Sequence, residues 1–394
     1  MSATLYAHRL FLRAGLAIAN VFAWIFVFEY FSALAGDIAR GLSATALLYA
    51  LTQIIIVVAT PMSAAHLRRG TKHSMIWGVV CAAGAFVYLG ATLAGFFTLD
   101  TGMAFGWGMA AYAVLLGTYR ALYWVPYKLH ATQDHERHHM RAYLEVLVAL
   151  MPLFAGMTLE MLPAAQLHVL FGAAALIVLS ALPILFMQDT RERYSWSYVY
   201  TFVQLFRSKN TGFVLQAILE GIQGAALFLA WPIAIFIILE WSYAGLGVVF
   251  SLTLLFILLL RRVYRWVLAR YQLENSVAVQ STLNITAWIS RLAAGTPIGI
   301  VFADVYSHTV APVRGVHADA FTFEQMGDRG AFVDEYTALK EIGLAFGRIM
   351  LCVLLFFLPF VFILPIVLTI ALLVAAVASG ISAVIAKRMP VAAY

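Results

Sequence analysis

Apolar runs of about twenty residues recur along the whole chain, separated by short polar segments. A bilayer core of about 30 Å needs roughly 20 apolar residues in a helix, so each run is long enough to cross a membrane. Hydrophobic residues make up 63% of the 394 residues and charged residues only 11%. Soluble domains carry about 25% charged residues and could not bury this much apolar surface. The sequence therefore predicts an all-α polytopic membrane protein.

Twelve such runs are predicted, in two sets of six. The boundary between the ninth and tenth runs is the least marked, because only a short turn at 293–297 separates them and they carry Arg291 and Asp304. The predicted membrane-spanning ranges are 13–35, 42–65, 74–97, 102–126, 141–162, 165–187, 211–239, 242–260, 274–293, 296–316, 341–362 and 364–386.

Lysine and arginine are distributed very unevenly between the two sides that these spans define. Almost all of them, Lys340 included, fall in connections on one side, and only Arg40 and Arg291 fall on the other. Because positive residues stay on the cytoplasmic side, both termini are predicted to be cytoplasmic. The net charge of +6 is spread over short clusters. This pattern favours a lipid bilayer, and not a nucleic acid, as the surrounding partner.

The longest polar connection lies between the sixth and seventh predicted spans. It contains the aromatic-rich stretch Tyr194–Phe206 with basic residues on both sides. Such a mixture is typical of a helix that lies in the headgroup region of a membrane. The chain is therefore predicted to consist of an N-terminal six-helix bundle (1–190), a cytoplasmic interfacial connector (191–210) and a C-terminal six-helix bundle (211–394).

Two six-helix halves with both termini on the same side resemble the major facilitator superfamily. The loop Pro61–His73 has Gly70 and the basic residues of that superfamily's characteristic loop but lacks its Asp, and Arg261–Gln272 lacks both Gly and Asp. The resemblance is therefore to a divergent branch, and Arg120–Ala131 and Glu335–Ile349 are similar to an uncharacterised bacterial one. It implies a secondary active transporter that moves a small solute by alternating access, in a bacterial-type inner membrane. It also implies that the first, fourth, seventh and tenth helices line a central cavity.

Several charged residues lie inside the predicted spans. An ionised side chain at the bilayer centre is costly, so such residues usually face a cavity or a partner. At 1.5 Å per residue, Glu220, Asp304 and Arg348 lie roughly 12 Å along their helices, near mid-membrane. Three other charged residues, Glu29, Arg120 and Arg291, lie near a predicted membrane–water interface. Snorkelling of their side chains toward water accounts for them.

Helical periodicity places polar residues in stripes on the four predicted cavity helices. Gln216, Glu220 and Gln223 share one face of the seventh helix, and Asp304 shares a face with His308 on the tenth. The other stripes are Arg120, Tyr123 and Trp124 on the fourth helix, and Asn20 and Trp24 on the first. Transporters built from two repeats bind substrate where such faces meet near the midplane. The residues predicted to bind substrate or to couple its movement are therefore Arg348 and eight residues of the seventh, tenth and fourth helices: Gln216, Glu220, Gln223, Asp304, His308, Arg120, Tyr123 and Trp124.

Two interpretations of Glu220, Asp304 and Arg348 stay open. In the first, the three form a buried ion-pair network that holds helices together. In the second, they border a water-filled cavity, where two carboxylates beside one cation leave an acid that can exchange a proton. The second interpretation predicts a small-molecule substrate and makes protons a candidate coupling ion.

One loop suggests a different class of protein. His135-Glu136-Arg137-His138-His139 matches H-E-x-x-H, which in zinc peptidases places two imidazoles on one helix face. Asp134 precedes the match, Arg137 lies within it and no third ligand is evident, so a solvated basic loop is favoured. A membrane-embedded metal-dependent enzyme, with His135 and His139 as metal ligands, is one alternative. A non-transporting scaffold or sensor with a transporter fold is the other.

Motifs for cofactor chemistry are missing from the sequence. It contains no Gly-rich phosphate loop, dinucleotide fingerprint or nucleophile elbow, and its polar segments are too short for an ATPase. The sequence therefore predicts neither an enzyme nor a bound cofactor. Transport must then be driven by an ion or substrate gradient.

Overall fold

The computed structural model of the chain describes residues 3–97, 106–132, 138–162, 165–187, 189, 196–271, 277–310 and 334–388, and these residues form helices without any strand. The first set of helices is α1 (Ala3–Ala35), α2 (Ile38–His66), η1 (Leu67–Arg69), α3 (Thr71–Leu93), α4 (Gly106–Thr132), α5 (His138–Met161), α6 (Ala165–Leu179) and α7 (Ala181–Ile184). Between the sets lie α8 (Tyr198–Leu205) and η2 (Ser208–Asn210). The second set is α9 (Thr211–Ala225), η3 (Ala226–Ala230), α10 (Trp231–Ile238), α11 (Tyr243–Tyr271), α12 (Val277–Leu292), α13 (Pro297–Val310), α14 (Asp334–Phe357), η7 (Leu358–Phe360) and α15 (Leu364–Arg388).

Eight helical segments of the described residues are long and apolar enough to cross a membrane. This confirms a multi-pass membrane protein. Within the residues that the structure describes, each of the twelve predicted ranges contains a helix or consecutive helices. The four segments outside the eight are α4, α5, α12 and α13, and the last two have only 16 and 14 described residues. A count of twelve spans therefore stays a prediction.

Two helices begin well before their predicted spans. α1 begins at Ala3 and not at 13, and α14 begins at Asp334 and not at 341. Polar residues on these extra turns are buried against partners: His8 bonds to Tyr123 and Lys340 pairs with Glu220. An apolar run therefore marks the middle of each helix and misses the turns whose polar side chains are satisfied inside the protein.

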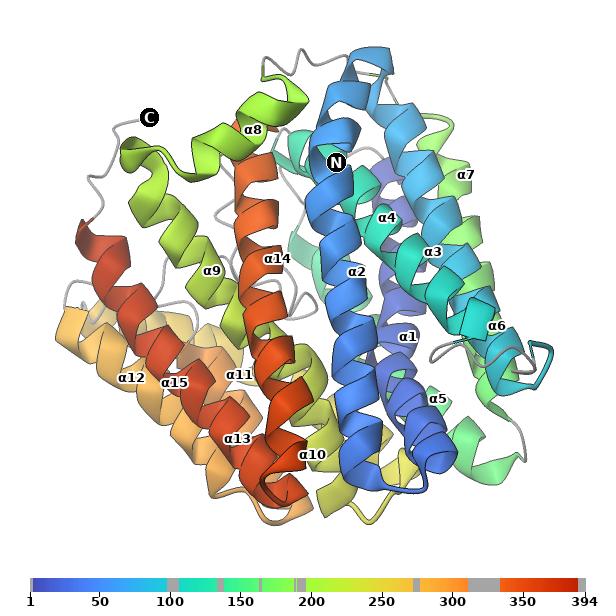
Figure 1. Cartoon of the computed structure of the whole chain (residues 1–394), viewed down its shortest axis with the longest axis vertical. Coiled ribbons are helices and arrows are strands. Elements are labelled where there is room, and N and C mark those ends of the chain that lie inside the picture. Colours follow the sequence, from blue (N-terminus) through green and yellow to red (C-terminus); the bar gives the residue numbers. More distant parts are fainter. Residues whose placement is uncertain are drawn as a thin grey trace.

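Within each set, the helices pack mainly on one another. α3 contacts α4 and α6 in the first set, and α9 contacts α14 and α15 in the second. The two sets meet along α2 with α14 and along α5 with α11. Figure 1 shows α2 and α14 side by side at the centre of the molecule. Chain segments almost three hundred residues apart therefore form the central seam.

The short helix α8 lies across the ends of the bundle, beside α14 (Figure 1). Ser197 caps its first turn by accepting a hydrogen bond from the Tyr200 N–H at 3.2 Å. Its inner face buries Thr201, whereas Val199 and Phe206 are 69% and 85% exposed. An apolar outer face and a buried inner face suit a helix that lies in the plane of the membrane surface.

Glycines allow the closest helix approaches. A Cβ on Gly221 of α9 would overlap the carbonyl oxygen of Leu344, and one on Gly347 of α14 would overlap that of Ile218. On α11, a Cβ at Gly247 would overlap the carbonyl oxygen of Pro152 on α5. Small residues at helix crossings let membrane helices pack through their backbones. Gly221 and Gly347 thus fix α9 on α14, which positions the polar residues of both.

Candidate functional site

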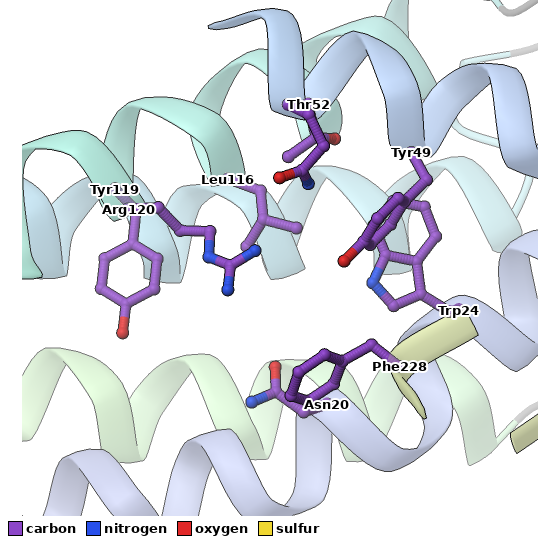
Figure 2. A pocket seen from close by; sticks show the side chains of 9 residues that line it. Asn20, Trp24, Tyr49, Thr52, Leu116, Tyr119, Arg120 and Phe228 are labelled. Carbon is purple, nitrogen blue, oxygen red and sulfur yellow. The ribbon is translucent and has the colours of Figure 1, made fainter. Parts of the chain in front are cut away.

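A small polar cavity lies between α1, α2, α4 and η3, and so joins the two sets of helices. Its volume is about 20 Å³, room for about one water molecule. Figure 2 shows the Arg120 guanidinium entering the space, with Asn20 and Phe228 opposite and the polar atoms of Tyr49 and Trp24 turned inward. The lining residues are Asn20, Trp24, Tyr49, Thr52, Gln53, Leu116, Tyr119, Arg120 and Phe228.

The cavity lies near the middle of the bundle. Arg120 is at the centre of α4, roughly 21 Å from Gly106, and is 6% exposed. The expectation that Arg120 snorkels to an interface is therefore wrong, because α4 continues beyond the predicted end of its apolar run. Asn20 and Gln53 occupy the middle of α1 and α2 in the same way.

A break in the seventh helical segment brings Phe228 to the cavity. The segment η3 is a π-helical turn, in which the Trp231 N–H donates to the carbonyl oxygen of Ala226, five residues earlier. Pro232 follows, and a proline ring clashes with the carbonyl four residues before it, here that of Phe228. The wider turn relieves this clash. π-turns inside helices frequently mark functional sites.

Gln53 connects the cavity to the second set of helices. Its Oε1 accepts a hydrogen bond from Arg348 Nη1 at 3.2 Å, across the seam between α2 and α14. Because a guanidinium only donates, this bond fixes the orientation of the Gln53 amide. Its Nε2 group is then a buried donor, and it has no acceptor among the described residues. Gln53 itself is 0% exposed and lines the cavity.

Glu220 lies beside the cavity helices without lining the cavity. Its Oε1 accepts a hydrogen bond from Gln216 Nε2 at 2.9 Å, and its Oε2 lies 3.4 Å from Lys340 Nζ. The Lys340 side chain is 6% exposed, so it is buried in a helix and does not lie in a solvent-exposed connection. Gln223, on the same helix, donates to the Leu219 carbonyl at 3.2 Å. The polar stripe predicted on the seventh helix is therefore present, and Lys340 of α14 balances the negative charge of Glu220.

Asp304 belongs to a second buried cluster. Arg291 Nε donates to its Oδ1 at 2.9 Å, and both side chains are almost fully buried. Trp231 Nε1 lies 2.9 and 3.0 Å from the two carboxylate oxygens. The Arg291 guanidinium also lies 4.5 Å from the Trp288 ring centroid. His308 is buried on the same helix, 4% exposed.

These contacts correct two sequence expectations. Lys340 pairs with Glu220 and Arg291 pairs with Asp304, so each carboxylate has a cation of its own. The expectation that two carboxylates lie beside a single cation is therefore wrong. Arg291 is also not a snorkelling residue, because the carboxylate of α13 holds it inside the protein.

The aromatic residues of α4 divide between the cavity and the packing core. Tyr123 is fully buried, 2.7 Å from His8 Nε2, and stacks on Tyr127 with centroids 5.2 Å apart. Trp124 packs edge-on against Tyr123. Neither is a lining residue of the cavity. His8 Nδ1 lies 2.7 Å from the Ser180 carbonyl, so this cluster ties α1, α4 and the turn before α7 together.

Sequence reasoning missed the contribution of α2 to the cavity. Tyr49, Thr52 and Gln53 stand on a helix that the resemblance did not place at the cavity. Gln53 is a polar residue directly before the apolar triplet Ile54-Ile55-Ile56, and this signal was available. Glu29 was also misjudged, because it bonds to the Tyr243 hydroxyl on α11 and does not snorkel. Gln166 donates to the same hydroxyl at 3.0 Å.

The histidine loop falls largely outside the described residues. The structure gives no side-chain contacts for His135, Glu136 or His139, so the proposed zinc ligands are not placed. Among the residues that are described, no group of three or more His, Cys, Asp or Glu side chains could hold a metal ion.

Comparisons with known proteins identify the fold. No protein-family model matches the chain, and no curated protein matches it. A bacterial homologue of the iron transporter ferroportin, solved in an inward-facing state, aligns with a TM-score of 0.63 at 14% identity, over 98% of this chain and 97% of that one. The nucleoside transporter NupG aligns at 0.57 and 14%, over 99% of both chains. A POT family transporter in complex with a thioalcohol-conjugated peptide aligns at 0.62 and 13%, over 98% of this chain and 96% of that one. The chain therefore has the fold of these transporters along its whole length.

Proposed function

We propose that the protein is a secondary active transporter that moves a small solute across the membrane by alternating access. The observation that carries this proposal is the polar cavity at the middle of the bundle, which residues from both sets of helices enclose. A buried polar site at the interface of two helical repeats is where transporters of this kind bind substrate. The fold shared with the three transporters supports the same conclusion.

The proposed architecture has twelve spans, with the bundles 1–190 and 211–394 rocking about the seam and residues 191–210 as a cytoplasmic connector. Both termini would face the cytoplasm of a bacterial-type cell, as the lysine and arginine distribution favours. The cavity holds about one water molecule in this conformation, so substrate entry requires the helices around it to separate. This proposal includes the division of the chain at residues 191–210 and the cytoplasmic location of both termini. It also includes the assignment to the major facilitator superfamily.

Within the proposal, the site residues take different roles. Arg120 and Arg348 serve substrate binding, the first by lining the cavity and the second through Gln53. Glu220 with Gln216 and Lys340 is the candidate coupling group, because a carboxylate held by a lysine can take up a proton when that lysine moves away. Asp304 is assigned a structural role, since Arg291 and Trp231 saturate its carboxylate. Tyr123, Trp124, Gln223 and His308 support the helices that carry the site.

Transport can be tested in proteoliposomes that contain the purified protein. We expect one class in a panel of radiolabelled organic anions, nucleosides, peptides and metal ions to enter saturably and to exchange in counterflow. Trp24→Ala in the cavity should lower that rate at least about tenfold, the effect of about 1.4 kcal/mol. Trp107→Ala, on a residue that is 65% exposed, is the matched control and should leave the rate unchanged.

Absence of uptake for every class, from protein that is folded and correctly reconstituted, would contradict the proposal. A partner protein that co-purifies stoichiometrically under those conditions would favour the scaffold alternative. Stoichiometric zinc that is lost on His135→Ala would favour the membrane-embedded enzyme.

A further inference from the structure

We infer that the substrate is a small organic anion, a carboxylate or phosphate attached to an aromatic ring, which binds in the cavity between Arg120 and Gln53. This inference rests on the proposed transport function and names the chemical class of its substrate. The charge of the lining, the unpaired amide donor and the aromatic walls each support it.

The cavity presents positive charge without an acidic residue. Arg120 is the one ionised group among the nine described lining residues, and Arg348 lies behind Gln53. Glu220 is not a lining residue, and its carboxylate pairs with Lys340. A guanidinium inside the membrane domain is costly and is retained where it recognises a charged ligand or holds a partner. Its planar fork matches the oxygen atoms of a carboxylate or a phosphate.

The polar atoms beside Arg120 include further donors. Gln53 Nε2 is buried, and it has no acceptor among the described residues because Arg348 holds the other end of the amide. A buried amide donor without an acceptor is costly, and an oxygen atom of a ligand would satisfy it. Trp24 has a donor-only indole that turns toward the same space (Figure 2). Thr52 contributes no free proton, since its hydroxyl donates to the Leu48 carbonyl at 3.2 Å.

The remaining walls are aromatic. Trp24 and Tyr49 pack edge-on with centroids 4.8 Å apart, and they present one side of the cavity. Phe228 approaches from η3 on the other set of helices and faces them across the space (Figure 2). Aromatic rings pair favourably when stacked with an offset or edge to face. A ligand with its aromatic ring between these walls and its anionic group toward Arg120 would contact the aromatic rings, the Gln53 amide and the guanidinium.

Binding can be measured by thermal unfolding of the full-length protein in detergent and by quenching of tryptophan fluorescence. The probes are benzoate and phenyl phosphate, their neutral and cationic counterparts benzamide and benzylammonium, and acetate as an anion without a ring. We expect benzoate or phenyl phosphate to raise Tm, and the other three probes to raise it much less. The choice between the two anions distinguishes a carboxylate from a phosphate substrate.

Gln53→Glu is the sharpest variant, because it keeps an oxygen for Arg348 and replaces the Nε2 donor with a second oxygen. The new carboxylate can pair with Arg348, so folding should be retained, while anion affinity should fall at least about tenfold. Arg120→Gln should lower anion affinity by a similar factor. Arg40→Gln, whose side chain is 72% exposed, is the matched control and should leave affinity unchanged.

The outcomes separate this inference from the transport proposal. Stabilisation by benzamide or benzylammonium instead of the anions, no stabilisation by either aromatic anion, or an unchanged anion affinity in Gln53→Glu would each overturn the inference. Acetate that binds as well as benzoate would overturn its aromatic part. Uptake of another solute class would then leave the transport function standing. Anion binding without any uptake would leave the inference standing and overturn transport.

Discussion

At the scale of single residues, three buried charged side chains contact different partners. The sequence placed Glu220, Asp304 and Arg348 at similar depths, and the structure separates them onto Lys340, Arg291 and Gln53. Depth can be read from the sequence because it follows from the rise per residue. The choice of partner cannot, because it depends on how helices far apart in the chain rotate and cross. Buried charges in membranes still mark sites that need explanation.

The Asp304–Arg291 pair gives the first prediction. Asp304→Asn keeps an oxygen for Trp231 but leaves the Arg291 guanidinium buried without its carboxylate, which should lower the free energy of unfolding by about 3–5 kcal/mol. Chemical unfolding of the purified protein in detergent measures this change. Asp37→Asn, in a pair whose side chains are 47% and 72% exposed, should change stability by less than about 1 kcal/mol. Equal effects of the two variants would show that the buried pair does not stabilise the fold.

Glu220 gives the second prediction, which tests coupling. Glu220→Gln retains an oxygen that can accept from Gln216 but can no longer exchange a proton, and it releases Lys340 from its ion pair. If Glu220 couples transport to protons, uptake of the transported solute in proteoliposomes should lose its dependence on pH and on a proton gradient. The loss of stability should be smaller than for Asp304→Asn, because the side chains of the Lys340–Glu220 pair are 6% and 15% exposed and those of the Arg291–Asp304 pair only 1% and 3%. An unaltered pH profile would assign the pair to packing.

At the scale of helices, glycine contacts decide which faces meet. The apolar runs predicted where helices lie, and the stripes correctly placed Asn20, Trp24 and Arg120 on faces that meet. The position of α2 at the cavity was not predictable from periodicity. It follows from its seam with α14, where Gln53 reaches Arg348 across almost three hundred residues of sequence. The π-turn at η3 could likewise not be predicted from the sequence, although Pro232 indicated an interruption of the helix there.

The α9–α14 crossing gives the third prediction. Gly347→Ala would place a methyl group on the Ile218 carbonyl oxygen and force the two helices apart, which should destabilise the protein by about 1–3 kcal/mol. The same unfolding measurement detects this. Gly172→Ala is the matched control, since no atom lies within 4 Å of its added Cβ, and it should stabilise the protein, by about 0.5–1 kcal/mol, because alanine favours a helix interior over glycine. A tolerated Gly347→Ala would mean that the crossing adjusts freely and does not fix the site.

At the scale of the whole molecule, the two sets of helices touch through polar contacts as well as through packing. At the C-terminal end of α1, Glu29 bonds to Tyr243 on α11, and Ser43 Oγ donates to the Phe356 carbonyl at 3.1 Å. Rocking of one bundle against the other must open contacts of this kind on one side while it closes the cavity on the other. Composition predicted the membrane class, but such long-range contacts depend on the assembled bundle.

The Glu29–Tyr243 contact gives the final prediction. In a background of Cys81→Ser and Cys352→Ala, the pair Glu29→Cys with Tyr243→Cys can be linked by a short bifunctional methanethiosulfonate reagent. Because alternating access requires α1 and α11 to separate at this end, the linked protein should lose at least about nine-tenths of its uptake, a barrier increase of about 1.4 kcal/mol or more. Reduction of the cross-link should restore uptake in the same proteoliposomes.

A second cross-link within one bundle serves as the control for this experiment. Thr286 on α12 and Tyr306 on α13 are hydrogen-bonded at 2.8 Å between their side-chain oxygens, so cysteines at these positions should link equally well. Both helices belong to the same set, and their link should leave uptake unchanged if each bundle moves as a unit. Loss of uptake from the link inside one bundle, or full uptake with α1 and α11 joined, would contradict a rocking movement about the central seam. The first result would place the movement within a bundle, and the second would leave the α1–α11 contact closed throughout the cycle.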